Sequence, residues 1–149
     1  MIKVGIIGFG KIGERHLNAY LNIENVKVEW LCDENVEQIR MFESKINITN
    51  DYNEVLESDV DVIDICTPTF THHEIIRKDL ENDKHVFCEK PFKHKLEYDY
   101  EIKKKAEKSD KVLMVGFLYR FHPSFKLLKD VLEKDIIGKP YYAIFRLGG

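Results

Sequence analysis

Long apolar runs are missing from this 149-residue sequence. No stretch approaches the roughly 20 apolar residues that a helix needs to span a bilayer, so we expect no membrane partner. We also expect no secretory leader, because Met1–Val4 leads directly into a strand-like pattern without a charged region, an apolar run or a cleavage site. A cytoplasmic location is therefore the default expectation.

Cysteine is scarce, with three residues that lie far apart in the sequence: Cys32, Cys66 and Cys88. No two of them form a C-x-x-C pair, and each closes an apolar run. That position favours a small buried side chain over a metal ligand. We therefore expect no metal site.

An excess of positive charge is also missing. The chain has 23 Lys and Arg against 26 Asp and Glu, a net charge of −3, with the two signs interspersed. The one basic cluster, Lys103–Lys105, lies between Glu101 and Glu107, which is typical of a solvated helix face. We therefore expect no nucleic-acid partner.

The sequence does contain a regular alternation of apolar, β-rich runs with helical patterns. Strands are expected at Ile2–Ile7, Val26–Cys32, Ile46–Thr49, Val60–Cys66, Lys84–Cys88 and Lys111–Val115. Helical patterns lie between them, at Ile12–Leu21, Val36–Ile46, Tyr52–Glu57, Thr71–Glu81 and Lys95–Lys108. Parallel strands need helical crossovers, and helices on both faces leave the strands apolar on both sides. The repeats predict an α/β fold with a doubly wound parallel sheet.

The rhythm changes after Gly116. One more helix is indicated around residues 125–132, and after a Gly-Lys-Pro break Tyr141–Leu147 alternates as a strand with one apolar face. We predict a dinucleotide-binding domain over residues 1–120 and, over residues 121–149, the linking helix and first strand of an incomplete substrate or dimerisation domain. The lone strand must fold back, pair with a second copy or stay disordered. We expect pairing, and hence a homo-oligomer formed through this region.

The turn between the first strand and the first helix has the pattern G-x-G-x-x-G. Gly8 permits the tight turn, Gly10 lets the backbone approach a pyrophosphate, and Gly13 allows the helix to pack closely on the sheet. The free N–H groups at the start of the helix then face the phosphates. An incidental glycine turn is the alternative, but the position in an α/β chain favours dinucleotide binding. The predicted cofactor-binding residues here are Gly8, Phe9, Gly10, Lys11, Ile12 and Gly13.

An acid follows the second strand at Asp33, where a carboxylate can accept hydrogen bonds from the ribose hydroxyls of adenosine. The alternative role is an N-cap for the next helix. Glu34 comes directly after it, and two adjacent acids would repel a 2′-phosphate. We therefore predict NAD as the cofactor, with NADP disfavoured.

Two polar stretches follow the fourth and fifth strands, at the edge of the sheet where ligands bind in such folds. Thr67 and Pro68 would form the wall beside the nicotinamide ribose, and Glu89 would shape the same end. Lys90 leaves this edge in directions that Pro91 restricts. A cationic amine there can orient a substrate hydroxyl and stabilise alkoxide character, so Lys90 is the predicted catalytic residue. An ordinary surface lysine is the alternative.

Two histidines lie in the stretch that follows Thr67. Thr71 and Glu74 have the S/T-x-x-E spacing of a capping box, which places His72 and His73 in the first turn of a helix near the cofactor. Two solvent-facing histidines are the simplest interpretation. For His72, the family resemblance described below implies a second possibility, that of a cofactor-binding residue.

Four patterns in chain order resemble those of the glucose-fructose oxidoreductase, inositol dehydrogenase and rhizopine catabolism family, written Gfo/Idh/MocA. They are Gly8-x-Gly10-x-x-Gly13 with His16, Thr67-Pro68 with His72 and Glu74, Glu89-Lys90-Pro91, and Val115-Gly116-Phe117 with Arg120, Phe121 and Pro123. The set covers most of the chain. It is far more specific than the glycines alone.

The resemblance implies an N-terminal NAD(P)-binding Rossmann domain followed by a second α/β domain that covers the active site and commonly forms the dimer. It implies that Lys90 contacts the reacting hydroxyl of a sugar, cyclitol or derivative, and that an acid/base histidine comes from the second domain. The sequence departs from the family at Leu118, where a polar residue is common. Arg120 is retained, as a structural ion pair or a ligand contact.

The resulting hypothesis is the cofactor domain of an NAD-dependent oxidoreductase acting on a sugar-like polyol, inactive as this chain alone. One alternative is a non-enzymatic NAD-binding regulator, because a fold does not by itself imply catalysis. A second is a reductase of biliverdin or of aspartate-pathway intermediates. Lys90 favours the polyol enzyme, since a sensor has no need of it.

Overall fold

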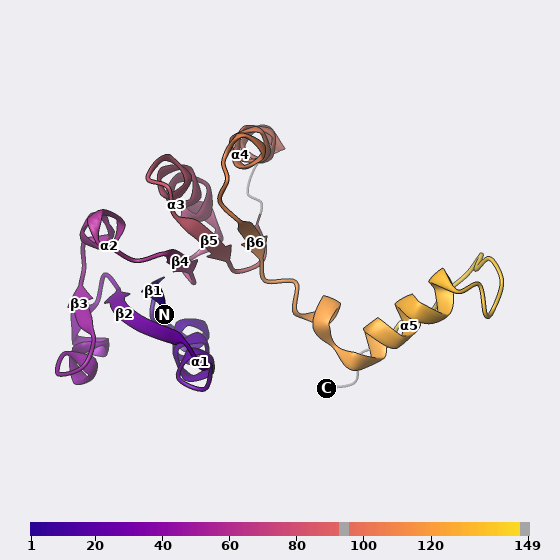
Figure 1. The fold of residues 1–149 in the computed structure, drawn as a ribbon, viewed down its shortest axis with the longest axis horizontal. Helices are drawn as coiled ribbons and strands as arrows, with labels where there is room; N and C mark the ends of the chain where they lie inside the picture. The colour runs from indigo at the N-terminus through magenta and orange to yellow at the C-terminus, as the bar shows by residue number, and fades with distance from the viewer. Residues whose placement is uncertain (93–95, 147–149) are drawn as a thin grey trace. The chain divides into compact units, whose positions relative to one another are not determined.

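The computed structural model describes residues 1–92 and 96–146, without the side chains of residues 96–99. The chain divides into two compact units, Met1–Gly116 and Phe117–Gly149 (Figure 1). The predicted start of a helix at Lys95 and the predicted end of a strand at Leu147 lie outside the described residues. The predicted domain boundary at residue 120 falls four residues after the division between the units.

The first unit is built on a sheet of six parallel strands in the order β3-β2-β1-β4-β5-β6. The strands are β1 (Ile2–Ile7), β2 (Val26–Cys32), β3 (Asn47–Thr49), β4 (Val62–Ile65), β5 (His85–Cys88) and β6 (Leu113–Val115). This strand order is that of the doubly wound Rossmann sheet. The predicted fold class is confirmed.

Helices cover the two faces of this sheet (Figure 1). They are α1 (Lys11–Tyr20), α2 (Tyr52–Glu57), α3 (Thr69–Glu81) and α4 (Leu96–Lys108), with the short 3-10 helices η1 (Val36–Gln38) and η2 (Arg40–Phe42). Side chains alternate along each strand, so Ile6 packs in the core with Leu17 of α1, while Ile7 packs in the core with Ile76 of α3. Burial on both faces explains the near-continuous apolar strands.

The segment after β2 is not the single helix that its spacing predicts. It forms η1 and η2, which meet at Ile39. Val36, Ile39 and Phe42 recur every three residues, which is the period of a 3-10 helix. Ile39 is fully buried, so the tighter helices still deliver the apolar side chain to the core.

Helix α3 carries one buried acid. Asp79 of α3 is fully buried, and neither carboxylate oxygen has a hydrogen-bond partner among the described residues. Burial raises the pKa of Asp79 to about 8, against the opposing effect of Lys84. The side chain is therefore largely protonated near neutral pH.

Replacing Asp79 with Asn is expected to change stability little at pH 4 and to raise the free energy of unfolding by a few kcal/mol at pH 8. In the unfolded chain an aspartate ionises near pH 3.9, well below the folded pKa, so the wild type loses up to about 1.4 kcal/mol per pH unit in between. The neutral amide has no such loss. Urea unfolding across this pH range measures the difference, with the exposed Asp110→Asn as control. A difference that stays constant with pH would contradict the assignment.

The second unit contains η3 (Leu118–Phe121) and α5 (Pro123–Glu133). The ring of Phe125 lies 5.3 Å from that of Tyr119 and 6.3 Å from that of Phe145, measured between centroids. No strand forms over residues 141–146, so the strand predicted at Tyr141–Leu147 is wrong over its described part. A strand needs a hydrogen-bonded neighbour, and the described part of this unit offers none.

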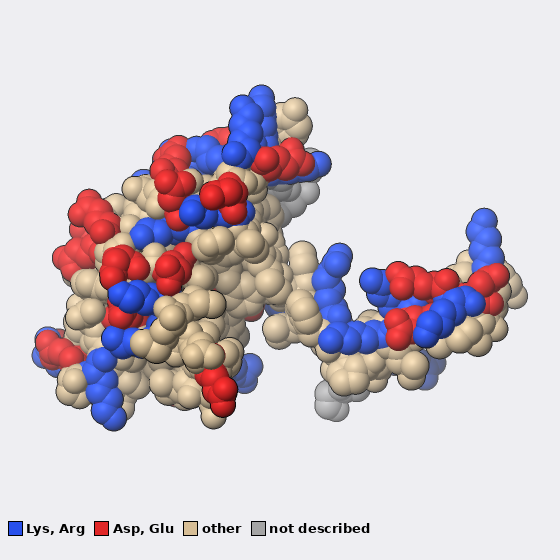
Figure 2. All heavy atoms as spheres, in the orientation of Figure 1, with Lys and Arg blue, Asp and Glu red and all other residues tan. Residues whose placement is uncertain are grey.

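The charged residues are interspersed over the surface. On the face shown in Figure 2, Lys and Arg lie next to Asp and Glu in each unit, without a broad patch of one sign. No helix in the described part of the chain is long and apolar enough to cross a bilayer.

Candidate functional site

The candidate site lies at the rim, by which we mean the edge of the sheet where the strands reach their carboxyl ends. The strand order reverses here, with β2 on one side of β1 and β4 on the other. Gly8, which follows β1, has φ +89°, and a Cβ on it would lie 2.8 Å from backbone atoms of both Cys66 and Thr67. The turns after β1 and β4 are therefore in contact. Such a reversal is where ligands bind in doubly wound folds.

The three glycines of the first turn have different surroundings. A Cβ on Gly13 would lie 2.2 Å from the carbonyl oxygen of Gly8, whereas a Cβ on Gly10 would meet nothing within 4 Å. Gly13 therefore allows α1 to pack against the turn, and Gly10 faces open space. No side chain caps the start of α1, where Lys11 and Ile12 are exposed. The first-turn N–H groups are thus available to an anion.

The carboxylate of Asp33 is tied to the glycine turn. Its Oδ2 accepts a hydrogen bond of 2.7 Å from the backbone N–H of Phe9, and its Oδ1 accepts from Asn35 and Gln38. Asn35, rather than Asp33, stands at the N-cap position of η1, although Asp33 accepts from the backbone N–H of Asn35. Asp33 therefore lies beside the glycine turn. The predicted contact with the ribose needs an acid at this position.

The capping box predicted at Thr71 and Glu74 is wrong. Helix α3 begins at Thr69 with Pro68 as its N-cap residue, so Thr71 is already helical. The Thr71 hydroxyl lies 2.7 Å from Thr67 Oγ1 and 2.8 Å from the Pro68 carbonyl oxygen, which holds the preceding turn together. Glu74 is exposed and pairs with Lys78 at 3.4 Å.

His72 connects the turn after β4 to the turn after β5. Its Nε2 lies 2.8 Å from the carbonyl oxygen of Thr67, and its Nδ1 lies 3.2 Å from that of Pro91. The side chain is buried, so the solvent-facing position expected for it is wrong. Both ring nitrogens face backbone oxygens, so His72 connects Thr67 to the segment that contains Lys90 and Pro91. His73 is partly buried and lies 3.3 Å from Glu101.

The turn after β5 places a buried acid beside an exposed lysine. Glu89 is 9% exposed, and its Oε2 accepts a hydrogen bond of 3.1 Å from the backbone N–H of Lys90. A Cβ on Gly116 would lie 2.7 Å from Glu89 Oε1, so the carboxylate fits closely against that glycine. The Lys90 side chain is exposed at the rim, and the Lys90–Pro91 peptide bond is cis.

A buried polar network lies below the rim, and its function was missed in the sequence. The Nδ1 atom of His16 lies 2.8 Å from Asp64 Oδ2 and 3.3 Å from Cys66 Sγ, and its Nε2 lies 3.5 Å from Glu89 Oε1. Burial lowers the pKa of His16, but the hydrogen bond and charge of Asp64, with Glu89, outweigh burial and raise it. His16 and Glu89 belong to the quoted family-like patterns, and Asp64, an acid within the apolar run of β4, is the further sequence signal of this network.

The cysteines match the expectation of buried thiols. Cys32 and Cys88 are buried, and Cys66 is partly buried. Burial raises the pKa of Cys32 and of Cys88 to about 12, with smaller contributions from nearby acids. All three thiols are protonated at neutral pH, since burial also raises the pKa of Cys66.

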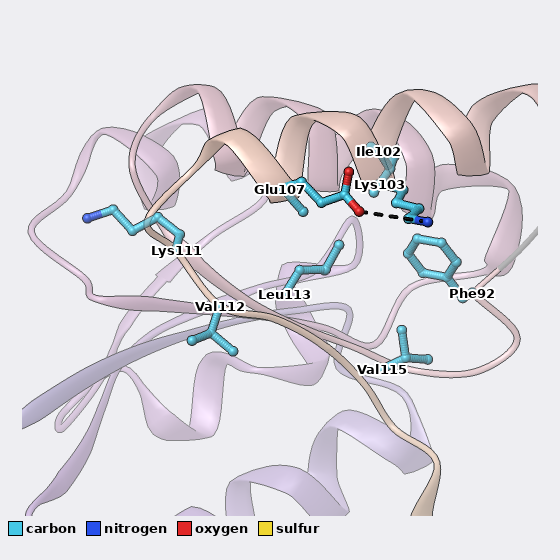
Figure 3. Close-up of a pocket in the computed structure, with 9 residues that line it drawn as sticks. Phe92, Ile102, Lys103, Glu107, Lys111, Val112, Leu113 and Val115 are labelled. Atoms are coloured by element: carbon cyan, nitrogen blue, oxygen red, sulfur yellow. Dashed lines mark ion pairs between the residues drawn. The ribbon is translucent and has the colours of Figure 1, made fainter.

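A hollow of about 490 Å³ lies between α4 and β6 (Figure 3). Its lining is mainly apolar, with Phe92, Ile102 and Leu113 beside an ion pair between Lys103 and Glu107. None of the predicted site residues lines it. Phe92 directly follows Pro91, so the hollow lies next to the turn after β5 without including a predicted site residue.

The first unit matches a family profile described as "Oxidoreductase family, NAD-binding Rossmann fold" over residues 2–117. The chain belongs to this family. It is the Gfo/Idh/MocA family that the sequence patterns resemble, so that prediction is confirmed.

Two curated relatives support the assignment. The chain is 36% identical over 144 residues to the uncharacterized oxidoreductase YrbE of Bacillus subtilis, covering 94% of this chain and 42% of the relative. It is 32% identical over 144 residues to myo-inositol 2-dehydrogenase of Thermotoga maritima, covering 94% of this chain and 43% of the relative. The chain thus spans less than half the length of these Gfo/Idh/MocA proteins.

Solved structures share the fold. Scyllo-inositol dehydrogenase from Lactobacillus casei, with NAD(H) and scyllo-inositol bound, matches with a TM-score of 0.87 at 24% identity, over 93% of this chain and 42% of that one. A variant of a 3-ketoreductase from Actinomadura kijaniata, in complex with TDP-benzene and NADP, matches with a TM-score of 0.81 at 27% identity, over 93% of this chain and 44% of that one.

Proposed function

We propose that this chain is the cofactor-binding part of an NAD-dependent dehydrogenase that moves hydride between nicotinamide and a secondary alcohol of a sugar, cyclitol or derivative. The observation that carries the proposal is that the glycine turn and Lys90 come to the same edge of the sheet from strands β1 and β5. The relative from Thermotoga maritima is a myo-inositol dehydrogenase, which supports the substrate class.

Each residue then has a defined task. The N–H groups at the start of α1 bind the pyrophosphate above Gly10, and Asp33 accepts from the adenosine ribose. Thr67 and Pro68 form the wall beside the nicotinamide ribose. The Lys90 ammonium orients the substrate hydroxyl and stabilises negative charge on its oxygen as hydride leaves the adjacent carbon.

The activity itself requires more protein than this chain. The rim of the described unit is open above Lys90, whose side chain is exposed, so water would not be excluded from the reacting atoms. We infer that the remainder of a longer protein, comparable in length to the relatives, covers the rim and supplies an acid/base group. This chain alone binds NAD without oxidising polyols.

Calorimetric titration of NAD and an assay of polyol oxidation test the proposal on this chain and on a longer protein that contains it. NAD binding by both, with turnover only by the longer protein, is the expected result. NAD binding without any polyol oxidation by the longer protein would favour the regulator instead.

Light scattering on the same samples tests the proposed self-association, which the exposed Tyr141, Ile144 and Phe145 support.

The proposed preference for NAD predicts a specific effect at Asp33. Relatives of known structure carry NAD(H) in one case and NADP in another, so the family does not decide the cofactor. Asp33→Ala should weaken NAD binding by about 10-fold or more, because a hydrogen bond to a charged group contributes about 1.5–3 kcal/mol. Glu37→Ala, in the exposed η1, is the control. Calorimetry that finds tighter binding of NADP than of NAD to the wild type would exclude the preference.

A further inference from the structure

The network below the rim places one imidazole between two buried carboxylates. His16 of α1 has an exposed side-chain fraction of 15%, Asp64 of β4 of 0%, and Glu89 after β5 of 12%. One ring nitrogen of His16 faces Asp64 at 2.8 Å, and the other faces Glu89 at 3.5 Å. Three separate elements thus bring one basic group and two acids together.

Two buried carboxylates that flank one imidazole need a compensating positive charge. In the described part of the chain, no lysine or arginine side chain pairs with Asp64 or Glu89. The other groups that face the network are neutral: burial, reinforced by Asp64, raises the pKa of Tyr20 and of Cys66. The ring of Phe87 stacks on that of His16 at 5.5 Å between centroids and closes the network with an apolar wall. The imidazolium form of His16 is therefore the counter-charge.

A metal ion is a weaker explanation of the same cluster. His16, Asp64 and Cys66 each offer a ligand atom, and these atoms lie within 4.8 Å of one another. Tetrahedral Zn²⁺ with bonds of about 2.0–2.3 Å would hold its ligand atoms roughly 3.3–3.8 Å apart. The 2.8 Å separation of His16 Nδ1 and Asp64 Oδ2 is instead that of a charge-assisted hydrogen bond. A shared proton accounts for this geometry.

We propose that His16 is a positioning residue whose imidazolium holds the Glu89 carboxylate in place, so that Glu89 in turn fixes the backbone of Lys90 at the rim. The Glu89 side chain has little freedom, because its Oε1 is held between Gly116 and His16. A Cβ on Gly116 would lie 2.7 Å from this oxygen, and His16 Nε2 lies 3.5 Å from it. Its other oxygen accepts from the Lys90 N–H. Loss of the proton from His16 leaves Glu89 as a buried charge without its partner, and the link to Lys90 loosens. The inference rests on the proposed function only for its effect on turnover.

The sign of the pH effect follows from the direction of the shift. A histidine whose pKa is raised on folding stabilises the folded state. This stabilisation is complete below the pKa of the unfolded chain, about 6.5, and is lost as pH rises through the pKa of the folded state. The Lys90 turn is therefore ordered while His16 is protonated and Glu89 is ionised, and it loosens as pH rises through the folded pKa of His16. In the longer protein, turnover falls over the same pH range.

Nuclear magnetic resonance on this 149-residue chain tests the link without any assay of activity. The His16 ring and the Lys90 backbone amide are expected to titrate with one common midpoint above pH 6.5. Asp64→Asn and Glu89→Gln should each lower the His16 midpoint by about one pH unit, the effect of removing one close opposite charge. The exposed Glu74→Gln should leave it unchanged. In His16→Gln the Lys90 amide should no longer respond in this range.

A His16 midpoint below 6.5, or a Lys90 amide that does not follow it, would overturn the proposal. Chemical-shift changes at His16 on addition of stoichiometric Zn²⁺, with a large rise in the unfolding temperature, would overturn it in favour of a metal site. If His16 and Lys90 titrate together but the longer protein oxidises no polyol, the proposed function fails and the positioning role stands. If the longer protein is active and its turnover follows the same midpoint, both hold. If one of the variants Asp64→Asn and Glu89→Gln does not fold, the other is sufficient for the test.

Discussion

Replacing Gly10 with alanine is expected to weaken NAD binding by about 10- to 100-fold while lowering the free energy of unfolding by less than about 1 kcal/mol. The backbone at Gly10, with φ −78° and ψ −166°, is accessible to any residue, and a Cβ there meets nothing within 4 Å. The fold therefore tolerates the methyl group. The pyrophosphate does not, because the methyl group occupies the space through which a phosphate oxygen reaches the first-turn N–H groups of α1. Calorimetry and thermal unfolding measure the two effects separately.

The matched variant is Gly13→Ala, which adds the same methyl group three residues later. Here the Cβ would lie 2.2 Å from the carbonyl oxygen of Gly8, a backbone atom that cannot move without distorting the turn. We expect a loss of about 1–3 kcal/mol in stability, with NAD binding lost along with the geometry of the turn. Gly10→Ala protein that binds NAD as tightly as the wild type would show that this turn does not hold the pyrophosphate.

Replacing Lys90 with methionine should reduce turnover in the longer protein by roughly 10²–10⁴-fold, the range for acid/base assistance by a positioned side chain. Methionine keeps most of the length and apolar surface of the side chain and removes only the ammonium. The affinity of this chain for NAD should change little, because the glycine turn is untouched. Steady-state kinetics and calorimetry on the two proteins measure the two quantities.

Lys103→Met is the control for Lys90→Met, since Lys103 lies on α4 with a side chain that is 72% exposed. It should retain wild-type turnover. Near-normal turnover of the Lys90 variant would return Lys90 to the status of a surface lysine that the adjacent proline merely orients. A loss confined to the apparent affinity for substrate would assign it to binding rather than to the reacting hydroxyl.

The strands, the crossovers and the glycine turn were predictable because each depends on a short stretch of sequence. Continuous apolar runs such as Ile2–Ile7 indicate strands that are covered on both faces, as the structure confirms. The G-x-G-x-x-G pattern spans six residues, and backbone sterics within that span determine the conformation of the turn. The resemblance to Gfo/Idh/MocA proteins extended this local information to a family that the profile match confirms.

Local patterns also misled in three places: at the Thr71–Glu74 capping box described above, after β2, and over residues 141–146. A spacing of three residues at Val36, Ile39 and Phe42 suits a 3-10 helix as well as an α-helix. In the structure, two 3-10 helices meet at Ile39 and bury its side chain. The alternation over residues 141–146 predicts a strand only where a neighbouring strand accepts its hydrogen bonds. The described second unit lacks one, and Phe145 stacks on Phe125 instead.

By itself, the sequence determined the parallel α/β architecture, the glycine turn after β1 and the position of Lys90 after the end of β5. Only the tertiary structure decided which side chains meet there. His16 and Asp64 are 48 residues apart, and His72 and Pro91 are 19 apart, and no periodicity relates them. The crossovers of the sheet bring their elements side by side, and burial then requires each charge and each ring nitrogen to find a partner. The polar network below the rim is therefore a consequence of strand order rather than of any local pattern. The same holds for His72, which connects the turns after β4 and β5.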